Sequence, residues 1–328
     1  MATSGGTDVE KLRLMQYAAA WGSPSLLPAC TKANAYLRFC ALQPGRDFEV
    51  EEPRAAQATW AQQLPVVQAG AQLLDASSLY SGLRARGLDA DAPLTAAQRA
   101  ESAAWSALIE ERLGVALLFS WWEEADNYAT VIRPAFAGRL PIPLCFYMPW
   151  TMRRRAHSQL ARRSCLDPEV VYAIGEEALA ALAQRLDGLL FFHSGTPSSV
   201  DASAFAYLTA ILRCPLPSDR LRRCMRGHAQ LVSYCERISE RYFGVEEGLL
   251  PAAQTSDITH GDDEALRSME VPSASSEKST RTPKQQRFKR RSRNALLAAG
   301  GSAVLYALAV NAFGEDANDL DEYESEDE

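Results

Sequence analysis

The segment that decides the fold is QLPVVQAGAQLLDAS, residues 63–77. Two short apolar runs lie on either side of Gly70, and the second run leads into Asp75-Ala76-Ser77. A glycine between two such runs is typical of a hairpin, whereas Asp and Ser are common at the first turn of a helix. The segment therefore predicts a strand, a turn, a second strand and the start of a helix.

The residues before this segment extend the pattern. Lys11 to Ala18 alternate as a strand does, Ala29 to Leu42 have apolar side chains at helical spacing, and Phe48 to Val50 fit a short second strand. The order β-α-β followed by β-β-α resembles the thioredoxin-like half of glutathione transferases. We assign residues 8–88 to this α/β domain.

The resemblance to glutathione transferases implies roles for three residues. It implies a cis peptide bond before Pro65, and it places Asp75 and Ser77 where active transferases hold the γ-glutamyl group of glutathione. An ordinary trans proline at a strand start is the alternative for Pro65. Asp75 and Ser77 also suit a helix N-terminus without any ligand, so we regard them as vestigial glutathione-site candidates.

Helical patterns dominate residues 94–245, which we predict to be an all-α domain like the C-terminal domain of glutathione transferases. Within it, Ser198 and Asp201 form a Ser-x-x-Asp capping box before an apolar helix at 202–212. The segment LPIPLCFYMPWTMR, residues 140–153, has three prolines and predicts an extended apolar strap. Its Phe146 and Trp150, with the upstream pair Trp121 and Trp122, are candidates for binding a protein partner; core packing is the alternative.

These motifs together resemble the metaxin family over residues 11–245. The carriers are the proline-rich segment, Trp121, Asn127-Tyr128 and Arg133 upstream of it, and Ser199 to Ala202, Leu216-Pro217 and Tyr234-Cys235 downstream. The resemblance implies a subunit of the sorting and assembly machinery of the mitochondrial outer membrane. It also implies binding to the β-barrel assembly core subunit, to β-barrel precursor proteins and to a second metaxin-like protein.

The C-terminal residues predict a membrane anchor. We interpret residues 246–294 as a disordered linker with a basic flank, 295–313 as a transmembrane tail anchor and 314–328 as an acidic tail. The basic flank should stay on the cytosolic side, which leaves the body in the cytosol. The tail alone does not separate the mitochondrial from the plastid outer membrane, and a buried soluble helix is the alternative.

Nothing in the sequence indicates catalysis, a cofactor or a metal. Tyr17, Ser23, Ser25 and Cys30 are the hydroxyl and thiol groups near the end of the first strand, but none lies in a transferase motif. The histidines stand alone, and the seven cysteines show no paired spacing, which favours reduced thiols. A membrane-anchored glutathione transferase or peroxidase and an outer-membrane tethering adaptor remain alternatives.

The net charge of −7 gives no support for nucleic-acid binding. Two arginine clusters, at 153–155 and 162–163, flank His157 on an expected helix. They fit either a solvated helix face or a contact with anionic lipid headgroups.

Overall fold

The computed structural model describes residues 11–52, 64–138, 140, 144–193 and 195–244. The predicted anchor at 295–313, its linker and the acidic tail lie outside these residues. Among the described helices, none is long and apolar enough to cross a membrane.

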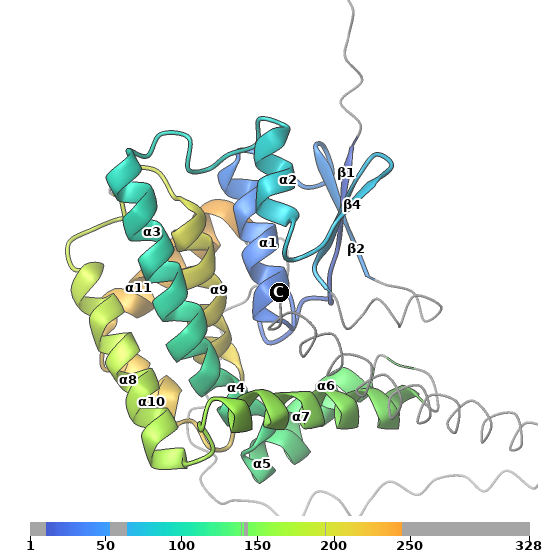
Figure 1. The fold of residues 1–328 in the computed structure, drawn as a ribbon, viewed down its shortest axis with the longest axis vertical. Coiled ribbons are helices and arrows are strands. Elements are labelled where there is room, and N and C mark those ends of the chain that lie inside the picture. Colours follow the sequence, from blue (N-terminus) through green and yellow to red (C-terminus); the bar gives the residue numbers. More distant parts are fainter. Residues whose placement is uncertain (1–10, 53–63, 139, 141–143, 194, 245–328) are drawn as a thin grey trace, which may run out of the picture. The chain divides into compact units, whose positions relative to one another are not determined.

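A four-stranded sheet forms the N-terminal part of the fold (Figure 1). The strands are β1 (Leu12–Met15), β2 (Phe48–Glu51), β3 (Val66–Ala69) and β4 (Gln72–Leu74), and their order across the sheet is β2-β1-β3-β4. β1 pairs in parallel with β2, and β3 pairs antiparallel with both β1 and β4. The predicted strand order along the chain is confirmed.

Local sequence explains the connections of this sheet. Helix α1 (Pro28–Phe39) makes the crossover between the parallel strands β1 and β2, as a parallel pair requires. Gly70 turns the chain between β3 and β4 with a positive φ of 67°, a conformation that glycine adopts without strain. Helix α2 (Leu79–Ala85) follows β4. The Leu64–Pro65 bond is cis, as the resemblance to transferases implies.

The rest of the described chain is helical, as predicted. Thr95 begins the domain with a capping box that it shares with Gln98. The elements in chain order are α3 (Ala96–Leu108), η3 (Ile109–Leu113), α4 (Gly114–Trp122), α5 (Ala125–Asn127), η4 (Tyr128–Ile132), α6 (Arg133–Ala137), α7 (Leu144–Arg162), α8 (Pro168–Arg185), α9 (Ser199–Arg213), α10 (Arg220–Arg226), α11 (Ala229–Ile238) and η5 (Ser239–Phe243).

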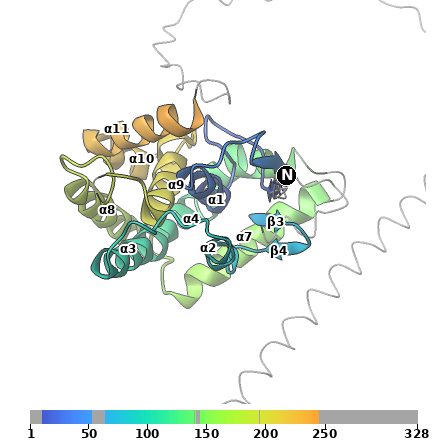
Figure 2. The same ribbon diagram turned by 90° about the horizontal axis from the view of Figure 1, so that it is seen from above.

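Helix α9 is the centre of the packing. It contacts α1, α3, α10 and α11, and Figure 2 shows it surrounded by them. Its residues Ala202, Phe205 and Leu208 are fully buried. Because α1 belongs to the sheet domain, the α1–α9 contact joins the two halves through one continuous hydrophobic core.

The prediction of an extended strap at 140–153 is wrong for its larger part. Helix α7 begins at Leu144 and continues through Pro149, which is buried inside it. A proline inside a helix removes one backbone hydrogen bond and costs about 3 kcal/mol in isolation. Burial of Met148, Thr151 and Leu160 against the body offsets that cost, because packing rather than propensity supplies most helix stability in proteins.

Candidate functional site

The hydroxyl and thiol groups considered for catalysis lie in or beside the loop between β1 and α1, and all are buried. Tyr17, Ser23, Ser25 and Cys30 are each less than a tenth exposed. The Ser25 hydroxyl donates to the backbone carbonyl of Tyr17 at 2.7 Å. The structure therefore brings these side chains together, but it turns them into the protein.

Burial also changes their acidity. It raises the pKa of the Cys30 thiol from an ordinary value of 9.0 to about 12, and it raises the pKa of Tyr17 from 10.0 to about 12. A nucleophilic thiol must be ionised near neutral pH, and catalytic cysteines have lowered pKa values for this reason. The pKa of Cys30 is raised instead of lowered, which is typical of a buried structural thiol.

The N-terminus of α1 does not supply a stabilising hydroxyl either. Its N-cap is Leu27, which makes no side-chain capping hydrogen bond, and Pro28 follows as the first helical residue. In a transferase this helix end would face the sulfur of glutathione.

A cavity of ≈ 250 Å³ lies beside this helix end. Glu110 is its one acidic lining residue, and this carboxylate pairs with Lys32 at 2.5 Å. None of the four catalytic candidates is among the lining residues, so the cavity suits an apolar group rather than thiol chemistry. The lining consists of Leu27, Pro28, Ala29, Glu110, Gly114, Val115, Leu117, Leu118, Trp121, Trp122, Gln159 and Tyr207.

The vestigial glutathione-site residues Asp75 and Ser77 are engaged within their own turn. The Asp75 carboxylate accepts the hydroxyls of Ser78 at 2.6 Å and of Ser77 at 2.8 Å, and the amide of Ser78 at 2.9 Å. These hydrogen bonds, chiefly that from the Ser78 hydroxyl, lower the pKa of Asp75 to about 2. Asp75 and Ser77 therefore stabilise the turn that directly precedes α2.

The four aromatic partner candidates divide into two pairs. Trp121 and Trp122 on α4 are 3% and 4% exposed, so their interpretation as partner surface is wrong: they are core residues. The Trp121 ring packs edge-on against Trp21, and that of Trp122 packs against Phe136. By contrast, Phe146 and Trp150 on α7 are 62% and 45% exposed.

The predicted capping box is confirmed and is part of a larger buried cluster. Asp201 accepts the amide of Ser198 at 2.9 Å and its hydroxyl at 2.8 Å. The same carboxylate also accepts the amide of Phe192 at 3.0 Å and the hydroxyl of Tyr234 at 2.9 Å. The box thus ties three segments of the helical domain together.

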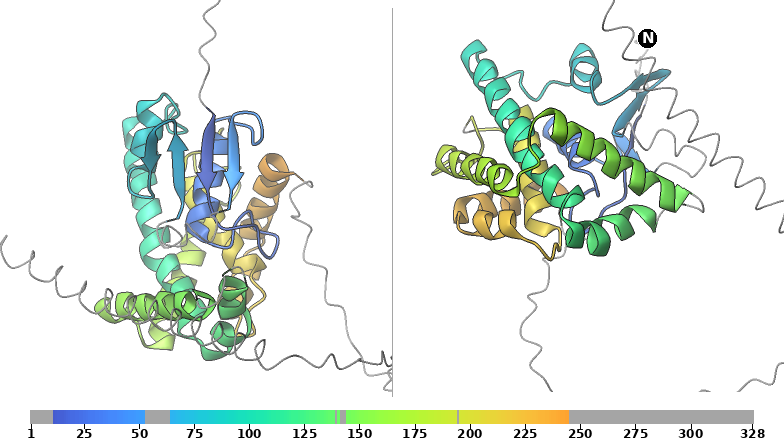
Figure 3. Two further views of the ribbon diagram at one scale, coloured as in Figure 1. Left: turned by 90° about the vertical axis from the view of Figure 1, so that its right-hand side faces the viewer. Right: turned by 60° about the horizontal axis from the view of Figure 1, so that its bottom comes forward.

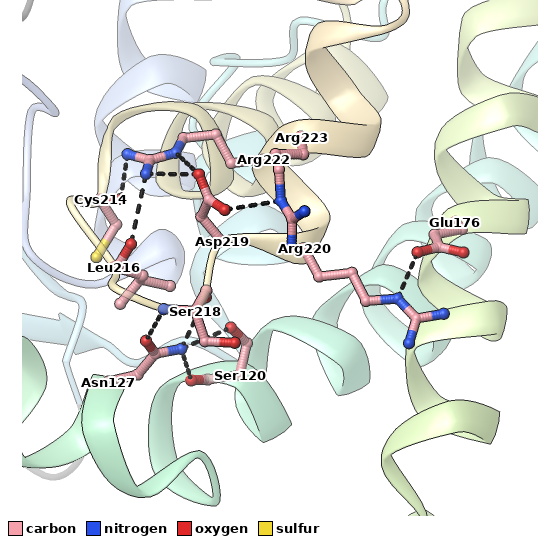
Figure 4. Close-up of polar contacts among 10 residues, drawn as sticks. All are labelled: Ser120, Asn127, Glu176, Cys214, Leu216, Ser218, Asp219, Arg220, Arg222 and Arg223. Atoms are coloured by element: carbon pink, nitrogen blue, oxygen red, sulfur yellow. Dashed lines mark hydrogen bonds and ion pairs between the residues drawn. The ribbon is translucent and has the colours of Figure 1, made fainter.

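A second polar cluster surrounds Asn127 (Figure 4), one of the residues that carries the family resemblance. Its side-chain amide donates to the carbonyls of Ser120 at 2.8 Å and Ser218 at 3.0 Å, and its oxygen accepts the Ser218 amide at 2.8 Å. Asn127 is fully buried. It therefore fixes the chain that leads into α10 against the end of α4.

The sequence analysis did not identify the charged part of this region. Asp219 pairs with Arg222 and Arg223, each at 2.9 Å, and Arg220 pairs with Glu176 of α8 at 2.8 Å. The only local signal is an aspartate directly before an arginine-rich helix, a pattern typical of a helix start. Glu176, the partner of Arg220, lies 44 positions away in the sequence, so a local pattern cannot reveal this ion pair.

Helix α7 has both arginine clusters, as expected. The guanidinium of Arg153 lies 4.4 Å from the ring centre of Tyr128, and that of Arg154 lies 5.8 Å from the ring centre of Trp150. Arg163, just beyond the helix, pairs with Glu111 at 2.5 Å. The helix thus carries positive charge beside its exposed aromatic residues.

No group of three potential metal ligands occurs in the described part of the chain. His157 lies 3.2 Å from the carboxylate of Glu123, and His193 lies 2.7 Å from the hydroxyl of Ser102. All seven cysteines are free thiols, as their spacing predicts.

Two family models match the chain. One, described as an outer mitochondrial membrane transport complex protein, matches residues 30–153. The other, the C-terminal domain of glutathione S-transferase, matches residues 175–238. The second match covers most of α8 and all of α9 to α11, so the thioredoxin-like sheet and the helical domain together form a glutathione-transferase-like fold.

Curated relatives are similar over most of the chain. Metaxin-3 of Danio rerio is 30% identical over 71% of this chain and 76% of its own length. Metaxin-1 of Sus scrofa is 30% identical over 73% and 78%, and Metaxin-1 of Macaca fascicularis is 31% identical over 71% and 75%.

Solved structures with a similar arrangement have low identity. A glutathione S-transferase of Ceriporiopsis subvermispora matches with a TM-score of 0.49 and 12% identity, covering 74% of this chain and 100% of that one. A β-etherase of Sphingobium matches with a TM-score of 0.48 and 16% identity, covering 73% and 98%.

Proposed function

Since the chain belongs to the metaxin family, we propose that it is a non-catalytic subunit of the mitochondrial sorting and assembly machinery, aiding the import and assembly of β-barrel proteins in the outer membrane. The matching family model, an outer mitochondrial membrane transport complex protein, indicates a role in protein import. We further propose that the imported proteins in whose assembly it takes part are β-barrel proteins.

The observation that supports a non-catalytic role is the state of Cys30, the thiol at the start of α1. It is fully buried, its pKa is raised to about 12, and it does not line the cavity beside that helix. A transferase needs a group that stabilises the glutathione thiolate in an open site. The fold would then serve as a scaffold rather than as an enzyme.

The partners that we propose are the β-barrel assembly core subunit, β-barrel precursors and a second metaxin-like protein. Residues 295–313 would anchor the chain as a single C-terminal span, with the body in the cytosol. Phe146 and Trp150 remain available for docking, whereas Trp121 and Trp122 do not.

Barrel assembly tests the proposed function directly. Cells depleted of the chain should accumulate unassembled outer-membrane barrels, and re-expression of the full chain should restore assembly. Cys30→Ala should restore it equally well, because a buried neutral thiol has no chemical role in this proposal. Normal assembly in depleted cells would favour the tethering adaptor instead.

Glutathione turnover separates the enzyme from the scaffold. We expect the purified full chain to conjugate no glutathione to standard electrophiles. Turnover that disappears in Cys30→Ala or Ser25→Ala would contradict the proposal and favour a transferase.

Membrane extraction tests the proposed anchor. The full chain should stay in the membrane pellet after carbonate treatment, and deletion of residues 294–328 should release the protein. Full-length protein in the carbonate supernatant would exclude a transmembrane anchor.

A further inference from the structure

One side of α7 combines protruding aromatic rings with arginines. Phe146, Trp150 and Arg154 follow one another at four-residue spacing, which places them along one stripe of the helix. All three are exposed. We call Phe146, Trp150 and Arg154 the aromatic–arginine face.

The body holds this helix in a fixed orientation. Met148, Thr151, Ala156 and Leu160 are buried on the opposite side of α7. In the view of Figure 1 the helix lies crosswise beneath α1, and the left panel of Figure 3 shows it, in yellow-green, near the lower end of the ribbon. Helix α7 therefore lies at one end of the described fold.

The stretch of chain that includes α7 has charge of one sign, and the carboxylates beside it, Glu111 and Glu123, face Arg163 and His157. Residues 127–166 contain seven arginines and not a single Asp or Glu, although acidic residues outnumber basic ones, 41 to 34, in the whole chain. The seven are Arg133, Arg139, Arg153, Arg154, Arg155, Arg162 and Arg163.

We propose that the aromatic–arginine face docks on an anionic lipid surface. Trp is favourable at the boundary between headgroups and acyl chains because its ring is apolar and its N–H group is polar. Phe is a purely apolar ring that interfacial helices bury at the same depth. Each basic residue near an anionic bilayer strengthens binding about fivefold, the equivalent of about 1 kcal/mol. Arg154 would contact headgroups while Phe146 and Trp150 enter the interfacial layer.

A lipid surface fits these residues better than a protein surface does. Arginine and tryptophan are frequent in protein interfaces too, but those interfaces match charges of both signs with shape-complementary contacts. Here a convex helix presents protruding rings within forty residues that lack a carboxylate. The proposal rests on the outer-membrane role proposed above, and it concerns the body rather than the predicted anchor.

Quenching of Trp150 fluorescence tests the contact. The full chain is mixed with vesicles of brominated phosphatidylcholine and phosphatidylserine, in which bromine quenches indole rings that it touches. We expect part of the tryptophan emission to be quenched. That part should be lost in Trp150→Phe, which keeps an aromatic ring on the face, and retained in Trp105→Phe, whose ring lies on α3.

Arg154 is tested with a matched pair of variants. Arg154→Gln should weaken vesicle binding about fivefold, measured by the Trp150-dependent quenching in the mixed vesicles, and vesicles of brominated phosphatidylcholine alone should show little of it. Arg226→Gln changes the net charge equally at an exposed position outside α7, and this control should quench like the wild type.

Three results would overturn the proposal. They are failure of the chain to float with the mixed vesicles, Trp150 unquenched in chain that does float, and equal quenching with or without anionic lipid. A photocrosslinker at position 150 that captures a protein in mitochondria, with Trp150 unquenched, would make the face a protein interface. Barrel assembly is measured separately, so a failure of the proposed function would be distinguishable from a failure of lipid docking.

Discussion

Asp201 joins several segments of the helical domain through one carboxylate. Its buried carboxylate accepts four hydrogen bonds, from the amides of Phe192 and Ser198 and from the hydroxyls of Ser198 and Tyr234. The amides of Phe192 and Ser198 and the Ser198 hydroxyl would lose this acceptor if the carboxylate were removed, whereas the Tyr234 hydroxyl would keep the backbone carbonyl of residue 201 at 3.3 Å. An unsatisfied buried donor costs about 1 to 3 kcal/mol.

We therefore predict that Asp201→Ala lowers the free energy of unfolding by about 3 kcal/mol or more. Asp75→Ala is a suitable control, because Asp75 is exposed and its hydrogen bonds stay within one turn. Urea denaturation of both variants measures the difference. A loss for Asp201→Ala no greater than that for Asp75→Ala would contradict this account.

Individual residues also show how far sequence reasoning reaches. The bond between Ser198 and Asp201 was predictable, since a capping box needs only four consecutive residues. The hydrogen bond from the Tyr234 hydroxyl to Asp201 was not predictable, because the two residues are 33 positions apart in the sequence. Asn127 and Ser218 are 91 positions apart. The family resemblance therefore included Asn127 but gave no indication of its hydrogen-bond partners.

At the scale of elements, α4 and α7 give opposite environments to aromatic residues that look alike in the sequence. Trp121 and Trp122 lie in an almost wholly buried helix, whereas Phe146 and Trp150 lie on the outer side of α7. The presence of an apolar residue in a helix does not show whether other elements of the fold will pack over that residue. Tertiary packing decides it, and the sequence analysis grouped all four together.

This difference predicts opposite stability effects. Trp121→Ala should lower the free energy of unfolding by about 3 to 5 kcal/mol, the usual cost of truncating a large aromatic residue in a core. Phe146→Ala combined with Trp150→Ala should leave the melting temperature almost unchanged. Thermal unfolding of the two variants decides between these assignments: a large fall for the α7 pair would mean that those rings support the fold.

The helix α7 shows why one local rule failed. Pro141, Pro143 and Pro149 together predict an extended chain, because proline lacks an amide donor and clashes with the preceding turn. Pro149 lies inside α7, where Met148 and Leu160 are buried against the body, whereas Pro141 and Pro143 lie outside the described residues. That burial is a long-range property, so the sequence pattern alone could not reveal it.

For the whole molecule, the order of strands and helices was predictable while the joining of the halves was not. Gly70 and the apolar runs around it predicted the β3–β4 hairpin from fewer than fifteen residues. The docking of α1 on α9 joins residues far apart in the chain. Arg38 adds a second contact between α1 and the helical domain, through η5: its guanidinium donates to the backbone carbonyl of Tyr242 at 2.5 Å and lies over the ring of Phe243.

The buried thiols of both halves make a further property of the whole fold predictable. Burial raises the pKa of Cys30 and of Cys235 from 9.0 to about 12. In the unfolded chain these thiols ionise near pH 9, whereas in the folded chain they keep their protons until about pH 12. Between these values the unfolded state binds fewer protons than the folded state, so stability must fall as the pH rises.

We predict that the free energy of unfolding is unaffected by these two thiols below about pH 8 and then declines above pH 9. The slope from each thiol should approach about 1.4 kcal/mol per pH unit. Urea denaturation between about pH 8 and pH 10 measures it. Cys30→Ala should remove the contribution of one thiol and so reduce the slope by up to about 1.4 kcal/mol per pH unit. A wild-type profile that stays flat to pH 10 would show that these thiols ionise as readily in the folded protein as in the unfolded chain.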